Sequence, residues 1–335
     1  MKAIKFFAIT AMAAAMFTSC STDDELSQSN YPSDNIIRIT AGVNNAKTRA
    51  EGAGTPLEKP LSLTVVNNNT ETTLANKYTY VNKVFSKNDN VWTCSETLLW
   101  QNDTQPVDIV AFAPAVDENT FKNAYDGGFK SFTYSVAANQ STSSDNNDLL
   151  YNYTPGFVPG GTNLDKDGKL SIQMNHAFCM IDIIVTLGTE FNVSGIPTTS
   201  PITEVTLGGT IIDATVDVTS TTTNKVTAST TAAAKDITAT PGAFTKPEND
   251  DKEKSCISHF SCITVPQNVA AKTFKVSLKT AGKRYEWTSE APVELLSGYR
   301  YKLELTMGND VVLLKGGSIT ATKWTEGTGG SLETD

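Results

Sequence analysis

Residues 170–187 read LSIQMNHAFCMIDIIVTL, and the apolar pattern of this stretch decides the fold. Leu170, Ile172 and Met174 alternate with polar residues, as in a β-strand with one buried face. After His176 the alternation continues in the opposite phase, with Ala177, Cys179, Ile181, Ile183 and Val185. A change of phase within one long strand predicts a bulge or bend near His176. We expect the strand to cross there between sheets or domains, and we place the domain boundary just after it, near Gly188.

The same alternation recurs along most of the chain and predicts an all-β protein. Thr, Ser, Asn, Val and Ile are abundant, and no long segment has the period of an amphipathic helix. The clearest predicted strands are Ile37–Val43, Leu61–Val66, Tyr78–Phe85, Val91–Cys94, Val107–Pro114, Phe129–Val136, Ile257–Val265, Phe274–Thr280 and Tyr301–Met307. Residues 219–240 are rich in Thr and Ala without a core pattern, so we expect a long mobile loop there.

Length and composition limit the classes of protein that this chain can be. It has 335 residues, 39% of them hydrophobic, and a formal net charge of −9. The length fits two domains of ordinary size. An acidic surface repels phosphate backbones, and no basic stripe with interleaved aromatic residues offsets it, so we expect no nucleic-acid partner.

The N-terminus carries an export signal. Lys2 and Lys5 accompany an apolar run, Ile4 to Phe17, that is too short for a membrane-spanning helix. The run leads into Thr18-Ser19-Cys20, the pattern of a bacterial lipoprotein signal. We therefore expect residues 1–19 to be removed and Cys20 to be lipidated, with an acidic tether behind it that directs the protein to the surface of a Gram-negative cell. An ordinary secretory signal with a chance cysteine is the alternative.

A second processing signal follows the first predicted strand. The apolar residues of that strand are Ile37, Ile39, Ala41 and Val43. Lys47-Thr48-Arg49-Ala50 comes next, ahead of a Gly-rich segment, and offers an accessible site to an arginine-specific protease. Cleavage between Arg49 and Ala50 would release a strand that belongs to the fold, although any secreted protein has loop arginines. The predicted division is a signal peptide at 1–19, a tether and first strand forming a propeptide at 20–49, and domains at 50–188 and 189–335.

Residues that could carry catalysis or bind a metal are sparse. The two histidines, His176 and His259, sit in apolar strands, and we interpret them as structural. Four cysteines besides Cys20, namely Cys94, Cys179, Cys256 and Cys262, form no zinc-binding pattern, and no nucleotide-binding or hydrolase motif is present. Residues 163–168 begin like a calcium loop, but Met174 stands where a bidentate glutamate is needed, so we predict a hairpin turn. We expect no enzyme, no metal and no cofactor.

In the order of these features the chain resembles the fimbrillin family of pilins. The matching pieces are the lipoprotein signal at Cys20, the strand ending at Thr48-Arg49-Ala50, Val107–Pro114, Asp148–Tyr151, His176-Ala177-Phe178, Ser297–Tyr301, Ile319, Trp324 and Gly327. The resemblance implies two tandem transthyretin-like Greek-key β-sandwich domains. It also implies a lipid-anchored precursor cut at Arg49-Ala50, whose lost first strand is replaced by C-terminal strands of another subunit. The donor residues would be Val311, Leu313, Ile319 and Trp324.

Two functions follow from this resemblance. The first is a structural subunit of a cell-surface fimbria that supports adhesion. Its partners would be other pilin subunits, an arginine-specific protease and, through the lipid of the precursor, the outer membrane. The alternative is a lipid-anchored surface protein that binds a glycan or another ligand, or an anchor or tip subunit that does not polymerise. Trp92, Trp100, Trp287 and Trp324 could stack on sugars, but in a β-sandwich tryptophans are more often core residues.

Overall fold

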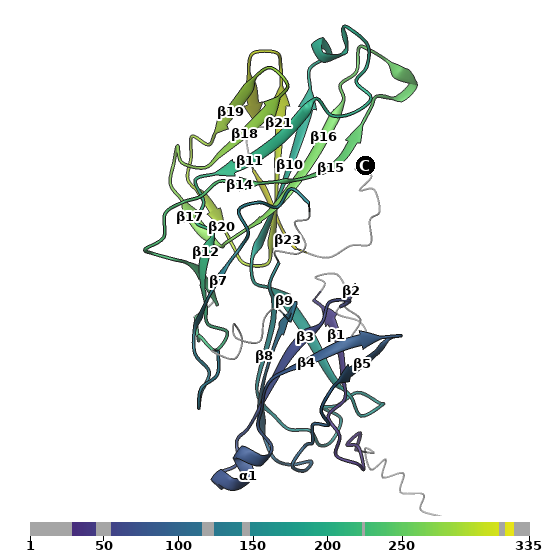
Figure 1. The fold of residues 1–335 in the computed structure, drawn as a ribbon, viewed down its shortest axis with the longest axis vertical. Coiled ribbons are helices and arrows are strands. Elements are labelled where there is room, and N and C mark those ends of the chain that lie inside the picture. The colour runs from purple at the N-terminus through teal and green to yellow at the C-terminus, as the bar shows by residue number, and fades with distance from the viewer. Residues whose placement is uncertain are drawn as a thin grey trace, which may run out of the picture.

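The structure is a computed structural model and describes residues 29–44, 55–115, 124–142, 148–222, 225–314 and 319–324. Figure 1 shows two lobes, one above the other, built almost wholly of strands. Among the described residues there is one α-helix, α1 (Thr72–Lys77), and it has no buried residue. The prediction of an all-β fold is confirmed.

The N-terminal lobe is one long sheet folded over its own core. Its strand order is β2 (Thr55–Pro56), β1 (Ile39–Val43), β9 (Leu170–His176), β8 (Leu150–Phe157), β6 (Val107–Ala113), β3 (Leu61–Asn67), β4 (Tyr80–Asn88) and β5 (Val91–Cys94). β8 and β9 pair through two residue pairs alone, so the sheet turns a corner there. β1 lies parallel to β9, whereas all other neighbouring strands of this sheet pair antiparallel. The buried core therefore lies between β2-β1-β9 on one side and the remaining strands on the other.

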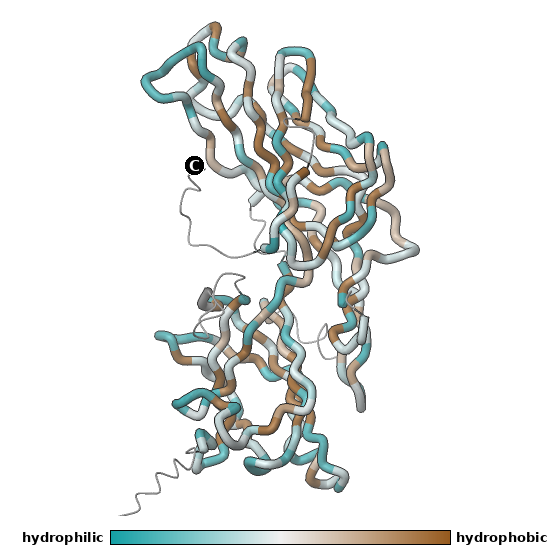
Figure 2. Tube along the Cα trace, turned by 180° about the vertical axis from the view of Figure 1, so that it is seen from behind, coloured by the Kyte–Doolittle hydropathy of each residue, from teal (hydrophilic) through white to brown (hydrophobic). Residues whose placement is uncertain are grey.

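The C-terminal lobe is a sandwich of two sheets. One sheet has the order β15 (Thr240–Thr245), β16 (Ile257–Thr264), β10 (Cys179–Leu187) and β21 (Tyr299–Met307), with β22 (Val312–Leu314) and β23 (Thr320–Lys323) both along the edge of β21. The other consists of β14 (Ile237–Thr238), β11 (Ile202–Gly208), β18 (Lys275–Thr280) and β19 (Arg284–Thr288). A small pair, β17 (Gln267–Val269) and β20 (Val293–Leu295), completes the lobe. Figure 2 shows apolar and polar residues alternating along many of these strands, as sandwich packing requires.

The predicted change of face at His176 is confirmed, because β9 belongs to the first lobe and β10 to the second. The two cores part between His176 and Ala177, however, and not near Gly188 as we expected. β10 lies in the middle of the C-terminal sheet, where Ile181, Ile183 and Val185 are at most 1% exposed. Alternation reveals that a strand changes face, but it does not reveal which sheet receives each half.

A three-stranded sheet joins the two lobes. It consists of β7 (Phe132–Ser135), β12 (Asp213–Val216) and β13 (Val226–Ala228), and we call it the bracing sheet. In Figure 1 it extends from the C-terminal lobe towards the N-terminal one. Phe132 packs edge-on against Phe112 of β6, with ring centroids 5.2 Å apart. Residues 124–142, which the predicted boundary assigned to the N-terminal domain, therefore contribute to the C-terminal core.

The expected long loop at residues 219–240 is wrong for a large part of that segment. It contributes β13 and β14, and Val226, Ile237 and Ala239 are buried in the C-terminal core. Each apolar residue is flanked by Thr, Ala or charged residues, so the alternation within the segment is too short to detect. Long-range pairing with β12 and β11 makes these strands, and sequence periodicity does not report such pairing.

Candidate functional site: the first strand and the C-terminal arm

The first strand, β1, is an internal part of the N-terminal lobe. It lies between β2 and β9, in a parallel register that pairs Ile39 with Leu170 and Val43 with Met174. Ile37, Ile39 and Val43 are 4%, 3% and 1% exposed, and Ala41 packs partly buried against the same core. All four apolar positions predicted for the removed strand thus contact the N-terminal core.

The residues before β1 are docked as well, and we call residues 29–44 the leader. The backbone N–H of Asn30 donates to the carbonyl of Gly161 at 2.9 Å, and the N–H of Ile37 donates to the carbonyl of Leu98 at 2.8 Å. Burial raises the pKa of Tyr31 to about 12. Residues 29–35, which precede the predicted strand at Ile37 and belong to the expected tether, are therefore docked on the lobe instead. The leader closes the lobe on two sides, against residues 98–100 and against β9.

The predicted processing residues Cys20, Arg49 and Ala50 lie outside the described residues. The described strands on either side show what a cut at 49–50 would divide. β1 ends at Val43, and β2 begins at Thr55 and pairs antiparallel with Gly42 and Val43. Such a cut would leave β1 held in the lobe by non-covalent contacts alone.

The C-terminal arm, residues 311–314 and 319–324, lies along one edge of β21. β22 pairs with Leu305–Met307, and β23 pairs with Tyr299–Lys302. Val312 is buried, but Val311 and Leu313 are 50% and 59% exposed. All four side chains of β23 are exposed. The arm is therefore apolar on both faces of β22, although the sandwich covers one of them.

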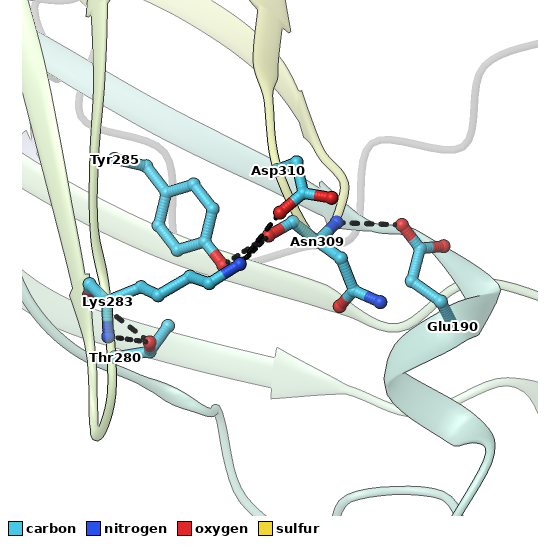
Figure 3. Close-up of polar contacts among 6 residues, drawn as sticks. All are labelled: Glu190, Thr280, Lys283, Tyr285, Asn309 and Asp310. Carbon is cyan, nitrogen blue, oxygen red and sulfur yellow. Dashed lines mark hydrogen bonds and ion pairs between the residues drawn. The ribbon is translucent and has the colours of Figure 1, made fainter.

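A cluster of polar contacts fixes the turn at which the arm begins (Figure 3). The backbone N–H of Asn309 donates to Glu190 Oε1 at 2.9 Å. The carbonyl oxygen of Asn309 accepts from Lys283 Nζ and from the hydroxyl of Tyr285, both at 2.9 Å. Lys283 Nζ also donates to Asp310 Oδ1 at 2.7 Å, and this carboxylate raises the pKa of Lys283. We call this cluster the root clamp, because it ties the start of the arm to a 3-10 helix, Thr189–Asn192, and to the β18–β19 hairpin.

The far end of the arm is docked where the two lobes meet. The indole of Trp324 is 7% exposed and stacks on the ring of His176, with centroids 3.8 Å apart and planes 8° from parallel. The backbone N–H of Trp324 donates to the carbonyl of Gly298 at 2.8 Å. His176 Nδ1 lies 2.6 Å from Asp148 Oδ2, and both residues are buried. Because the imidazole is covered by Trp324, this geometry fits the predicted structural role of His176 rather than acid–base catalysis.

The chain matches the family model described as fimbrillin-like over residues 48–324. This protein belongs to the fimbrillin-like family. A solved structure from Bacteroides ovatus, described as a "putative cell adhesion protein", has a TM-score of 0.59 and 15% identity, and the match covers 88% of this chain and 99% of that one. A structure with the same description from Bacteroides uniformis has a TM-score of 0.53 and 16% identity, with 88% and 100% covered. No protein with a curated description matches. At these identities the likeness shows the fold alone, and that fold is the β-sandwich architecture predicted for the chain.

The aromatic residues of this fimbrillin-like protein serve mainly as core. Trp92, Trp100 and Trp324 are at most 9% exposed, and Trp287 is half-buried against the C-terminal core. The interpretation of the tryptophans as core residues is confirmed for Trp92, Trp100 and Trp324, whereas Trp287 lies at the edge of the core.

The remaining candidates of the fimbrillin-like chain are structural too. Cys179, Cys256 and Cys262 are buried free thiols, and Cys94 is a half-buried one. The carboxylate of Asp165 accepts from the backbone N–H groups of residues 167 and 169, which confirms a turn at the former calcium-loop candidate. Within the described ranges, no group of three His, Cys, Asp or Glu side chains could hold a metal ion. No helix in the described part of the chain has both the length and the hydropathy to cross a bilayer.

Proposed function

We propose that this protein is a structural subunit of a cell-surface fimbria that assembles by protease-activated strand exchange. Membership of the fimbrillin-like family and the adhesion-related fold support a fimbrial or adhesion subunit at the bacterial surface. The observation that carries the mechanism is the position of β1. It seals the N-terminal core, and it ends six residues before the predicted scissile bond.

Removal of β1 would leave a groove that needs a new strand. One edge of β9 would lose its ladder from Leu170 to Met174, and unpaired backbone groups template the binding of another strand. Burial of Ile37, Ile39, Val43 and part of Ala41 contributes roughly 5–8 kcal/mol, at ~1.5–3 kcal/mol per large apolar side chain. While the chain is uncut, β1 gains this energy within its own molecule and excludes a donor. Cleavage removes that advantage and makes the exchange irreversible.

The C-terminal arm is the proposed donor. A donor strand places its alternate side chains in the pockets of the groove, so it needs a row of apolar residues that is free to enter them. Val311 and Leu313 meet this need, because they are half or more exposed while Val312 faces the core. Contacts between one subunit's arm and the next subunit's groove do not close on themselves, so they extend into a filament.

The proposed life cycle begins with a lipoprotein precursor. Export with a lipid on Cys20 would place the chain on the outer membrane, where an arginine-specific protease cuts at Arg49-Ala50. The other pilin subunits of the fimbria would then supply and receive donor strands. This order explains how a single chain stays monomeric during export and assembles only at the cell surface.

The test is limited digestion of the purified precursor with an arginine-specific protease. We expect a new N-terminus at Ala50 and a ladder of multimers on a denaturing gel run without boiling. Arg49→Lys is the matched control, because it keeps the charge but blocks an arginine-specific enzyme. A chain cut at Ala50 that stays monomeric would contradict strand exchange and favour the lipid-anchored binding protein or a terminal subunit.

A second variant tests the donor role of the arm. Leu313→Asn should leave the monomer folded, because Leu313 is 59% exposed, yet it should stop the multimer ladder after cleavage. Val91→Asn is the control, because Val91 is 60% exposed and lies in β5 of the N-terminal lobe, away from the arm. Equal multimer yields from the two variants would remove Leu313 from the donor strand.

A further inference from the structure

β9 links the two segments that strand exchange would have to move. At its C-terminal end, Met174 pairs with Val43 of β1, and its carbonyl accepts from the backbone N–H of Asn44 at 2.8 Å. The side-chain amide of Asn44 donates to Asn175 Oδ1 at 2.7 Å. The next residue, His176, carries the stacked indole of Trp324. Leader and arm therefore dock within three consecutive residues of one strand.

Within the arm, Val312 is buried and Leu314 and Ile319 pack partly buried against the C-terminal core, but beyond Ile319 the side chains have few contacts until Trp324. The start of the arm is fixed by the root clamp around Asn309. β23 has four exposed side chains, so its ladder with β21 is its main support until Trp324. Exposed edge ladders without buried side chains open easily. Trp324 is therefore the principal side-chain contact that keeps this end of the arm closed.

His176, the residue beneath Trp324, is held by contacts to three other residues of the chain. His176 is fixed by Asp148 through its ring and by Leu150 through the β8–β9 ladder. Its carbonyl accepts from Ser297 Oγ at 3.1 Å, and Ser297 Oγ also lies 2.8 Å from the carbonyl oxygen of Ala177. A stacked ring stays in place only while the ring beneath it does. Anything that loosens the end of β9 would therefore loosen Trp324.

We propose that Trp324 latches the C-terminal arm onto His176, and that β1 stiffens this latch through the end of β9, so that loss of the leader frees the arm. The inference rests on the proposed strand exchange and adds a step that regulates when the arm is released. The arm becomes available in the same molecule that has just acquired an empty groove. From Asp310 to Trp324 a released, extended arm could reach roughly 45 Å at about 3.3 Å per residue, enough to span a neighbouring domain.

The first experiment measures hydrogen exchange of the arm in the full uncut chain. In Trp324→Ala, the amides of residues 320–323 should exchange at least roughly tenfold faster than in the unaltered chain, with no change in the β10–β16 amides. Lys323→Ala is the matched control, because Lys323 is exposed and belongs to the same strand. Exchange within about twofold of the control would overturn the latch.

The second experiment tests the coupling to the leader. Val43→Ala and Ile37→Ala each remove buried atoms from the leader, but Val43 lies beside the end of β9, whereas Ile37 precedes β1 and lies against Leu98. Val43→Ala should accelerate exchange at residues 320–323, and Ile37→Ala should not. Acceleration by both variants, or by neither, would overturn the coupling.

These outcomes separate the latch from strand exchange itself. If the arm opens in Trp324→Ala but the cut chain never forms multimers, the latch stands and the proposed function fails. If the unaltered chain forms multimers after cleavage while Trp324→Ala leaves the hydrogen exchange of residues 320–323 unchanged, strand exchange stands and the latch fails.

Discussion

Truncation of Ile39 tests directly whether β1 seals the N-terminal core. Ile39 is 3% exposed and packs in the core cluster that includes Leu61, Leu63 and Met174. Replacing a buried isoleucine by alanine costs roughly 2–4 kcal/mol through lost burial and the cavity left behind. Because urea lowers the free energy of unfolding by roughly 1–3 kcal/mol per molar, the midpoint of the N-terminal transition should fall by about 1–2 M.

The assay is urea unfolding of the full chain, followed by hydrogen exchange of peptides from β3 and β6, which lie in the N-terminal core. Thr40→Ala is the control, since Thr40 is the half-buried neighbour on the other face of β1. A loss below about 1 kcal/mol for Ile39→Ala, or a loss equal to that of Thr40→Ala, would refute the reasoning. An empty groove would then destabilise the lobe too little to require a new strand, and β1 would not need a replacement.

Three further predictions concern the C-terminal lobe and the thiols. Gly209→Ala should destabilise the C-terminal domain by about 2 kcal/mol or more in thermal unfolding, because Gly209 has a φ of +84° and a Cβ there would lie 2.0 Å from a backbone carbonyl oxygen. Gly282→Ala should be neutral, because a Cβ at Gly282 would meet no atom within 4 Å. Thiol alkylation mapped by mass spectrometry should modify Cys94 first and leave Cys179 unmodified until unfolding, because burial raises the pKa of the Cys179 thiol and blocks access to it; equal rates would contradict this burial. Burial raises the pKa of Tyr301 from 10.0 to about 12, so its neutral form stabilises the fold below pH 10 and this contribution is lost as the pH rises towards 12. In alkaline unfolding followed by tyrosinate absorbance, the stability of Tyr301→Phe should therefore depend less on pH over that window, and an unchanged dependence would contradict the prediction.

Local patterns were sufficient wherever one face of a strand is buried over several residues. Val91–Cys94 is observed with the predicted bounds, and Val107–Pro114 differs by one residue at its end. Leu170–Met174 was predicted as a strand and its crossover at His176 as a change of face, because alternation records burial directly. The four apolar residues of the first strand could be chosen for the same reason, and each of them contacts the core.

Contacts between distant segments were not accessible from local patterns. Trp324 and His176 were both noted in the sequence, but nothing in either neighbourhood indicates that they stack, since 147 residues separate them. The root clamp joins Glu190 of a 3-10 helix, Lys283 of the β18–β19 turn and Asn309 of the turn after β21. β13 and β14 went unrecognised because their residues become strands only by pairing with β12 and β11.

The sequence by itself determined the fold class, the membership of the fimbrillin-like family and the residues of the first strand that face a core. These properties follow from alternation and from motif order, which are written in neighbouring residues. Only the tertiary structure decided where the two cores part, that the leader closes the N-terminal lobe on two sides, and that the arm ends on the strand that holds the leader. Those properties depend on which strands lie side by side, and strand pairing is set by packing over the whole chain rather than by any one segment.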